Sequence, residues 1–452
     1  MSSRSLSRSV FVGLLTLAVS GLSIASLAAT PAADVNEPLP LLPGLESRVE
    51  FWRSIYTRYT TRQVVVHDAL LPEVVYGVVE LGGTADGGQM EYPSDRDLTR
   101  QSRERVQMIL TRLATGQEPS TDEERLVLKA LSGVTGEDRL TLAVDRVRTQ
   151  RGQSDRFRAG LVRAGRYVDA FRALARAEGV PEDLALLPHV ESSFEQGARS
   201  HVGAAGMWQF MAGTGRRFLT IDVLRDERLD PWLAARAAFR LLRENYDLLG
   251  SWPLALTAYN HGQGGTLRAR GRFGDDLVSI IEGYDGRTFG FASRNFYAEF
   301  LAARDIAARP GDFFGPIDPE APMEFEWVRL DRPAGGPTLA ERWDVGVGVL
   351  AALNPALRPD VWSGRRSLPA GFEVRLPAEA FARVQSSQAA ARATAEVPTE
   401  VGLLRHVVRR GETLASIAVR YGTAVSHLVL ANGLRDASRI NVGQTLVIPV
   451  GR

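Results

Sequence analysis

Cysteine is absent from the 452-residue sequence, and the formal net charge is only +1. Without cysteine, the chain can form no disulfide, thiolate metal site, cysteine nucleophile or lipidated N-terminal cysteine. The small net charge provides no basic field of the kind that attracts nucleic acid, so we expect no nucleic-acid partner. The six histidines show no HExxH or similar ligand spacing, and we therefore predict no metal and no other cofactor.

The composition is that of a soluble globular protein, with 44% apolar and 24% charged residues. A chain of this length is too long for one compact core, so we expect about three domains. The first segment, residues 1–29, resembles an export signal: Arg4 and Arg8 precede an apolar run that ends in small residues near Ala28 and Ala29. Cleavage there is one interpretation, and an uncleaved membrane anchor is the other. Both place the working part outside the cytoplasm.

Two segments follow before the central part of the chain. Residues 30–97 are predicted to be a spacer and extension, and residues 98–150 a helical N-terminal region. The expected elements are an amphipathic helix over Glu50–Thr61, strands over Gln63–Val66 and Val74–Val79, and helices over Thr99–Ala114, Thr121–Leu131, Asp138–Arg148 and Asp155–Glu178. Pro188 should then interrupt a helix that opens near Pro181, because proline lacks the backbone donor.

Glu191 is the candidate catalytic residue, because it stands in an apolar stretch. Burial among apolar side chains penalises the ionised carboxylate and raises its pKa, as a general acid near neutral pH requires. The alternative is a glutamate at a helix end that points into water. Glycoside hydrolysis usually needs a second carboxylate. None of the acidic residues that follow has a comparable apolar setting, namely Glu195, Asp222, Asp226 and Asp230.

Three motifs resemble those of the lytic murein transglycosylases with a goose-lysozyme-like catalytic domain. The first is Glu191-Ser192-Ser193-Phe194 with Ala198, Ser200, Gly203-Ala204-Ala205-Gly206 and Gln209. The second is Ala258-Tyr259-Asn260-His261-Gly262, and the third is Ser293-Arg294-Asn295-Phe296-Tyr297. The Trp208-Gln209 pair is similar to the membrane-bound transglycosylase D branch of this family. The resemblance assigns residues 151–312 to a mainly α, lysozyme-like catalytic domain.

The resemblance implies a reaction that needs only one carboxyl group. Glu191 would protonate the glycosidic oxygen between N-acetylmuramic acid and N-acetylglucosamine, then deprotonate the muramic C6 hydroxyl, which closes a 1,6-anhydro ring. It implies that Tyr259 holds Glu191 by a hydrogen bond and that Tyr297 lines the cleft. The other implied substrate-binding residues are Ser200, Gly206, Gln209 and Asn260. Two prolines of the family pattern are replaced, by Gln196 and Ala212, which leaves the shape of the loop open.

The C-terminal third contains an internal repeat after a boundary rich in Pro, Gly and Asp over residues 310–322. Each copy reads as a small α+β unit of β-α-α-β order. The second copy, residues 403–450, resembles a LysM module, a binder of N-acetylglucosamine-containing glycans. The glycan groove of that family corresponds to Gly411, Glu412, Thr413, Leu414, Asn432, Gly433 and Ile440. The first copy, residues 323–380, is a degenerate LysM-like module expected to pack on the catalytic domain, and whether it binds glycan stays open. Residues 381–402 read as a linker, with a flexible tether over Gln385–Pro398.

Taken together, the motifs predict a multidomain, exported peptidoglycan lytic transglycosylase of the periplasm or cell envelope. Its expected partner is the peptidoglycan glycan strand, held by the LysM module. Two alternatives remain: a lysozyme- or chitinase-type hydrolase, and an inactive wall-binding scaffold. A scaffold has no need of the intact Glu191, Gln209, Tyr259 and Asn260.

Overall fold

The computed structural model describes residues 37–82, 94–395, 403–421, 423, 425–432, 434 and 440–449. The predicted export signal lies outside this part of the chain. The chain divides into two compact units, Met1–Arg375 and Leu376–Arg452. None of the helices in the described ranges is long and apolar enough to cross a membrane.

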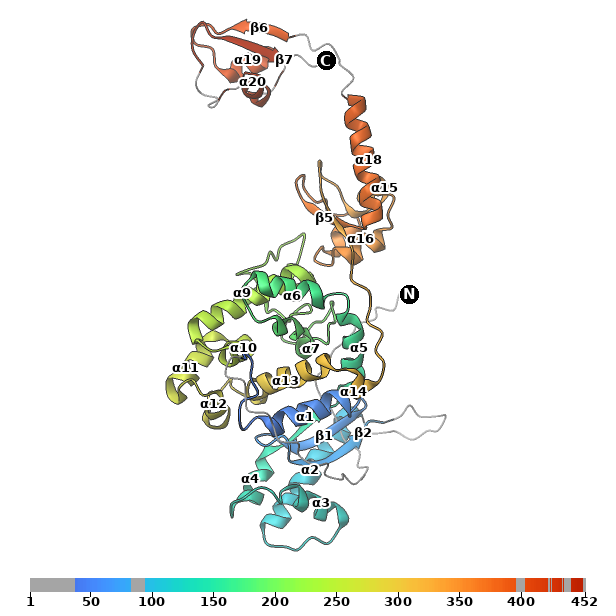
Figure 1. Ribbon diagram of the computed structural model, residues 1–452, viewed down its shortest axis with the longest axis vertical. Helices are drawn as coiled ribbons and strands as arrows, with labels where there is room; N and C mark the ends of the chain where they lie inside the picture. Colours follow the sequence, from blue (N-terminus) through green and yellow to red (C-terminus); the bar gives the residue numbers. More distant parts are fainter. Residues whose placement is uncertain are drawn as a thin grey trace. The chain divides into compact units, whose positions relative to one another are not determined.

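A three-stranded antiparallel sheet has the strand order β2-β1-β3, and Figure 1 labels its strands β1 and β2. It consists of β1 (Gln63–Asp68), β2 (Val75–Glu80) and β3 (Val147–Arg151). Helices α2 (Asp95–Ala114), α3 (Asp122–Ala130) and α4 (Arg139–Arg146) come between β2 and β3 in the sequence. Residues 30–97 and 98–150, which the sequence separates, therefore share one sheet. Strand β3 was not predicted, because its polar residues continue the helical pattern of α4; the helix expected to reach Arg148 ends at Arg146.

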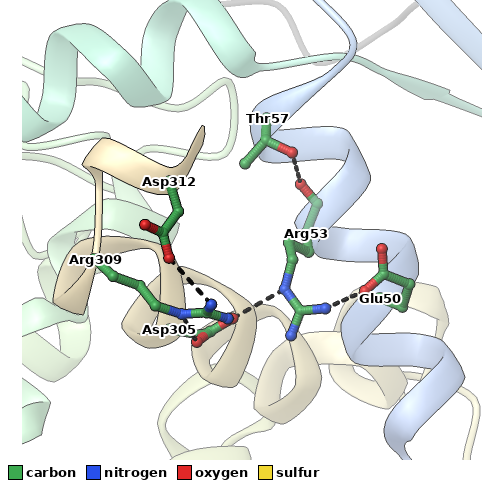
Figure 2. A network of polar contacts seen from close by, with 6 residues as sticks. All are labelled: Glu50, Arg53, Thr57, Asp305, Arg309 and Asp312. Carbon is green, nitrogen blue, oxygen red and sulfur yellow. Dashed lines mark hydrogen bonds and ion pairs between the residues drawn. The ribbon is translucent and has the colours of Figure 1, made fainter. Parts of the chain in front are cut away.

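Helix α1 (Glu46–Thr57) belongs to the main hydrophobic core rather than to a separate extension. Its buried Trp52, Ile55 and Tyr56 join a cluster that includes Phe157 and the long helix α13 (Phe291–Ala308). Polar contacts on the same helix pair reinforce this packing: Arg53 donates to Asp305 at 2.9 Å, and Asp305 also accepts from Arg309 (Figure 2). Such half-exposed pairs contribute little on their own. The buried aromatic face of α1 is therefore the main reason that it stays in place.

The rest of this hydrophobic core is helical. It is built from α5 (Ser154–Ala164), α6 (Val168–Ala177), η1 (Glu182–Leu186), α7 (Pro188–Glu191), α8 (Ala212–Gly215), η2 (Glu227–Leu229), α9 (Pro231–Leu249), α10 (Trp252–His261), α11 (Gln263–Phe273), α12 (Leu277–Gly283) and α14 (Gly311–Phe314). The break at Pro188 is as predicted, since η1 ends at Leu186 and α7 starts at the proline. The single helix predicted over Asp155–Glu178 is wrong: it divides at Gly165, where a Cβ would lie 2.4 Å from the carbonyl oxygen of Glu320.

The two C-terminal repeats share a β-α-α-β frame. The first has β4 (Glu326–Arg329), α15 (Gly336–Trp343), α16 (Val347–Leu353), an additional α17 (Pro359–Trp362) and β5 (Glu373–Leu376). The second has β6 (Leu403–Val407), α19 (Leu414–Arg420), α20 (Val425–Ala431) and β7 (Thr445–Pro449). The two strands of each repeat pair with each other.

One asparagine has the same structural role in both repeats. The Asn354 side chain donates to the carbonyls of Leu350 and Arg375 and accepts from the Arg375 amide. Asn432 makes the same three bonds, with Leu428 and Val447. Both units therefore tie the end of the second helix to the last strand through the same asparagine contacts. The flexible tether predicted over Gln385–Pro398 is wrong as far as residue 395, because helix α18 (Ala378–Ala395) covers it; alanine, the strongest helix former, dominates this segment.

Candidate active site

Glu191 is the last residue of α7 and lines a small pocket. Ser200 and Gln209 line the same pocket, so the structure brings together three of the residues predicted for catalysis and substrate binding. Burial raises the pKa of the Glu191 carboxyl from 4.5 to about 8. The group is therefore protonated at neutral pH, which is the state that a general acid needs.

The turn after Glu191 has an unusual backbone that its neighbours hold in place. Ser193 and Phe194 both have positive φ, at 52° and 57°, a conformation costly for residues other than glycine. The Arg163 guanidinium donates two hydrogen bonds to the Ser193 carbonyl, at 2.6 and 3.2 Å. Gly160 on α5 packs so closely that a Cβ would lie 2.9 Å from the same oxygen. Such local strain is common at functional sites.

The loop from Ser200 to Gln209 forms another side of the pocket. Gln209 has a φ of 48°, and its side-chain amide donates to the Gly206 carbonyl at 2.7 Å. Short bridges pair Ala205 with both Arg199 and Phe210, and the Ser200 hydroxyl accepts from the Ala204 amide. Although Gln196 and Ala212 replace prolines of the family pattern, these bonds give the intervening loop a defined shape.

The second and third motifs lie close by, but their contacts differ from those expected. The Tyr259 hydroxyl donates to the Trp208 carbonyl at 2.8 Å, which corrects the predicted bond to Glu191. Burial, followed by the charge of Glu191, raises the pKa of Tyr259, so the two groups are near one another. Asn260 is exposed and accepts from Ser293. Tyr297 is 1% exposed and donates to the Pro40 carbonyl, so it is buried instead of lining a cleft.

Three residues important for the site were not predicted. Gln153 and Arg156, at the start of α5, line the Glu191 pocket. Glu299 on α13 is a second carboxyl group near Glu191: burial and then the negative charge of Glu191 raise its pKa to about 8. These residues stand far from Glu191 in the sequence or outside the motifs. The one local feature that indicates Glu299 as a candidate is its apolar setting between Phe296 and Phe300.

Most residues predicted for the LysM groove instead serve the module's own fold. Glu412 accepts hydrogen bonds from the Arg409 amide and from His406, which lower its pKa to about 2, and it also pairs with Arg420. Leu414 is 2% exposed in the core, Ile440 packs against that core, and the Asn432 amide is fully used by backbone groups. Gly411 and Thr413 remain exposed, and Gly433 lies outside the described residues. In the described ranges, no group of His, Asp and Glu could hold a metal ion.

Comparisons with known proteins match two parts of the chain to families. Residues 169–278 match the Transglycosylase SLT domain, and residues 406–449 match the LysM domain. The chain is 28% identical over 330 residues to membrane-bound lytic murein transglycosylase D of Escherichia coli K12, covering 68% of this chain and 69% of that protein. It is also 37% identical over 94 residues to a putative tributyltin chloride resistance protein of Alteromonas, covering 20% of this chain and 44% of that one.

Two solved structures are similar to part of the chain. An inactive mutant of the lytic transglycosylase Slt from Pseudomonas aeruginosa is 20% identical, with a TM-score of 0.26, and the similarity covers 48% of this chain and 31% of that one. The 70-kDa soluble lytic transglycosylase of Escherichia coli is 16% identical, with a TM-score of 0.28, covering 48% of this chain and 44% of that one. This chain thus spans less than half the length of either structure.

Proposed function

We propose that this chain, a peptidoglycan lytic transglycosylase that also carries a LysM domain, uses Glu191 as its single catalytic acid and base. The observation that supports this role most strongly is the Glu191 carboxyl itself, which lies in a pocket where burial raises its pKa to about 8. A carboxyl that stays protonated at neutral pH can donate a proton to a leaving group. Because the substrate is peptidoglycan, the protein acts in the cell envelope.

The reaction proceeds in two proton transfers at one carboxyl group. Glu191 protonates the glycosidic oxygen that links N-acetylmuramic acid to N-acetylglucosamine, and the bond from muramic C1 to that oxygen breaks. The resulting Glu191 carboxylate then takes the proton of the muramic C6 hydroxyl as its oxygen bonds to C1. The products are a free 4-hydroxyl on N-acetylglucosamine and a 1,6-anhydro ring, and Glu191 is protonated again. No water is consumed, because the C6 hydroxyl of the substrate is the nucleophile.

Ser200, Gln209 and the backbone near Gly206 form the wall that faces the glycan. Tyr259 contributes indirectly: it fixes the Trp208 carbonyl and thereby the peptide that leads into Gln209. Digestion of purified sacculi by the full chain tests the proposal. Soluble muropeptides should appear with the wild-type protein, whereas intact sacculi at neutral pH would contradict it.

Arg156 is a free cation in the pocket and is expected to contact a carboxylate of the substrate. It is half-buried, lines the Glu191 pocket, and has no ion-pair partner among the described residues. Arg156→Gln should raise KM about 10-fold, since one charge-assisted hydrogen bond contributes roughly 1.5 kcal/mol. The measurement compares strands with intact stem peptides and strands stripped to the lactyl carboxylate, which identifies the carboxylate involved. Arg158→Gln, an exposed arginine on the same helix, is the control. Unchanged KM for both substrates would rule out this contact.

The LysM domain is expected to hold the enzyme on the wall. A tethered binder raises the effective concentration of the catalytic domain at its substrate. Deletion of residues 403–452 should therefore reduce co-sedimentation with sacculi by at least about 10-fold while leaving cleavage of soluble glycan strands unchanged. Equal sedimentation of the two proteins would show that binding resides elsewhere in the chain.

A further inference from the structure

The loop over residues 220–230 contacts the loop Ser200–Gln209, which we call the substrate loop. One buried arginine, Arg228, makes this contact. The Arg228 guanidinium donates to the carbonyls of Gly203 and Phe210, at 3.0 and 3.1 Å, and so holds both ends of the turn that leads into Gln209. Its remaining donors bind both carboxylate oxygens of Asp226, at 2.9 and 2.8 Å. Both side chains are almost fully buried, so this contact cannot be exchanged for water.

The loop over residues 220–230 also pairs, through its backbone, with the first LysM-like repeat. The Asp226 amide donates to the Ala356 carbonyl at 2.7 Å, and the Arg358 amide donates to the Leu224 carbonyl at 2.9 Å. Between these bonds, Arg225 and Leu357 face each other as an antiparallel bridge. Residues 224–226 of the loop and residues 356–358 of the repeat therefore pair through their backbones in antiparallel orientation.

A buried ion pair is the second contact between the repeat and the helical core. Arg375, whose side chain is 1% exposed, binds both carboxylate oxygens of Asp230, one of them at 2.9 Å. Asp230 also caps the start of α9. The guanidinium lies over the rings of Trp232, Phe325 and Trp327, with centroids 4.5 to 4.7 Å away. A charge desolvated to this degree is stable only while its partners stay in place, which favours a permanent interface over a transient one.

We propose that the first LysM-like repeat is a fixed brace of the active site, with Asp226 and Arg228 as positioning residues for the substrate loop. Residues 356–358, which pair with the catalytic domain, belong to the loop after the second helix of the repeat. In LysM modules this loop forms one side of the glycan groove, so the contact uses surface that glycan binding would need. The inference rests on the proposed function for its activity readout, but not for its contacts.

The absence of native cysteine allows a direct test of the contact in the full chain. Arg225 and Leu357 form a non-hydrogen-bonded antiparallel pair, whose Cα atoms lie about 4.5 Å apart, within the range that a disulfide spans. The double variant Arg225→Cys/Leu357→Cys should cross-link quantitatively on mild oxidation and keep wild-type activity. A folded double variant that fails to cross-link, or that loses activity on cross-linking, would overturn the brace.

Arg228→Lys tests the positioning role. Lysine keeps the charge, but its three donors share one nitrogen and cannot make all four hydrogen bonds of the planar guanidinium. We therefore expect kcat/KM on glycan strands to fall at least 10-fold. In a Glu191→Gln background, glycan affinity should fall as well. Arg217→Lys, at an exposed arginine that pairs with Glu244 instead of the repeat, is the control and should stay within twofold of wild type. Val127→Ala, a buried position of the N-terminal cluster, should lower Tm without changing glycan affinity.

The outcomes separate the two hypotheses. If the wild-type chain releases no muropeptides, the proposed function fails, while the cross-link still reports on the contact. If the wild type is active and Arg228→Lys matches it in turnover and affinity, only the brace is refuted.

Discussion

The Glu191→Gln variant is expected to release muropeptides from sacculi at least about 10³-fold more slowly than the wild-type chain. General acid–base catalysis contributes roughly 10²- to 10⁴-fold to a rate, and here one carboxyl performs both proton transfers. Glutamine preserves the shape of the side chain but cannot donate or accept that proton. The measurement is the initial rate of soluble product release, followed by chromatography. Glu195→Gln is the matched control, because Glu195 is exposed one turn later, and it should retain full activity.

The same substitution should make the protein more stable above neutral pH. Burial raises the pKa of Glu191 from 4.5 to about 8, so the folded state binds this proton more tightly than the unfolded state. The associated stability is fully present below pH 4.5 and is lost as the pH rises to 8. Glu191→Gln avoids this loss, so its advantage in free energy of unfolding should grow between pH 4.5 and 8 and reach the order of a few kcal/mol. A constant difference across this range would show that Glu191 titrates normally.

In the Gly206→Ala variant, the loop Ser200–Gln209 should no longer adopt its folded conformation. A Cβ at Gly206 would lie 1.7 Å from the Arg228 carbonyl oxygen, and the residue has a φ of +79°. Both the backbone clash and the left-handed conformation oppose the substitution, so we expect destabilisation of about 4 kcal/mol or more, measured by urea unfolding.

Gly203→Ala separates these two causes. Gly203 also has a positive φ, of +91°, but a Cβ added there would have no atom within 4 Å. It should therefore cost only about 1 kcal/mol, the penalty of the left-handed conformation alone. Equal losses for the two variants would mean that close packing against Arg228 does not matter.

The candidate site could be predicted where local sequence determines it. Glu191 was identifiable because its apolar neighbours adjoin it in the sequence, and the break at Pro188 follows from the chemistry of proline. The hydrogen bonds of Tyr259 and Tyr297 could not be predicted, since their acceptors, Trp208 and Pro40, are 51 and 257 residues away.

The organisation of the fold was predictable to a similar degree. Helices α2 and α3 follow from helical periodicity and the C-terminal repeat from recurring motifs, whereas the helix expected over Asp155–Glu178 divides at Gly165. Strand β3 could not be predicted, because its partner β1 lies some eighty residues earlier in the sequence and its own residues continue a helical pattern. The first repeat was expected to pack on the catalytic domain, but its contact through Asp226 and Arg228 was not predicted. Nothing in the local sequence indicates that Asp226 is buried or that its amide binds Ala356, more than a hundred residues later.

Digestion of purified sacculi in H₂¹⁸O, followed by mass spectrometry, tests the central claim most directly. In the proposed reaction the muramic C6 oxygen attacks C1, so water contributes no atom to the product. The wild-type chain should therefore yield muropeptides with 1,6-anhydro ends, 18 Da lighter than the reducing products, and without ¹⁸O. Reducing-end muropeptides that carry one ¹⁸O at C1 would contradict the account and identify a hydrolase.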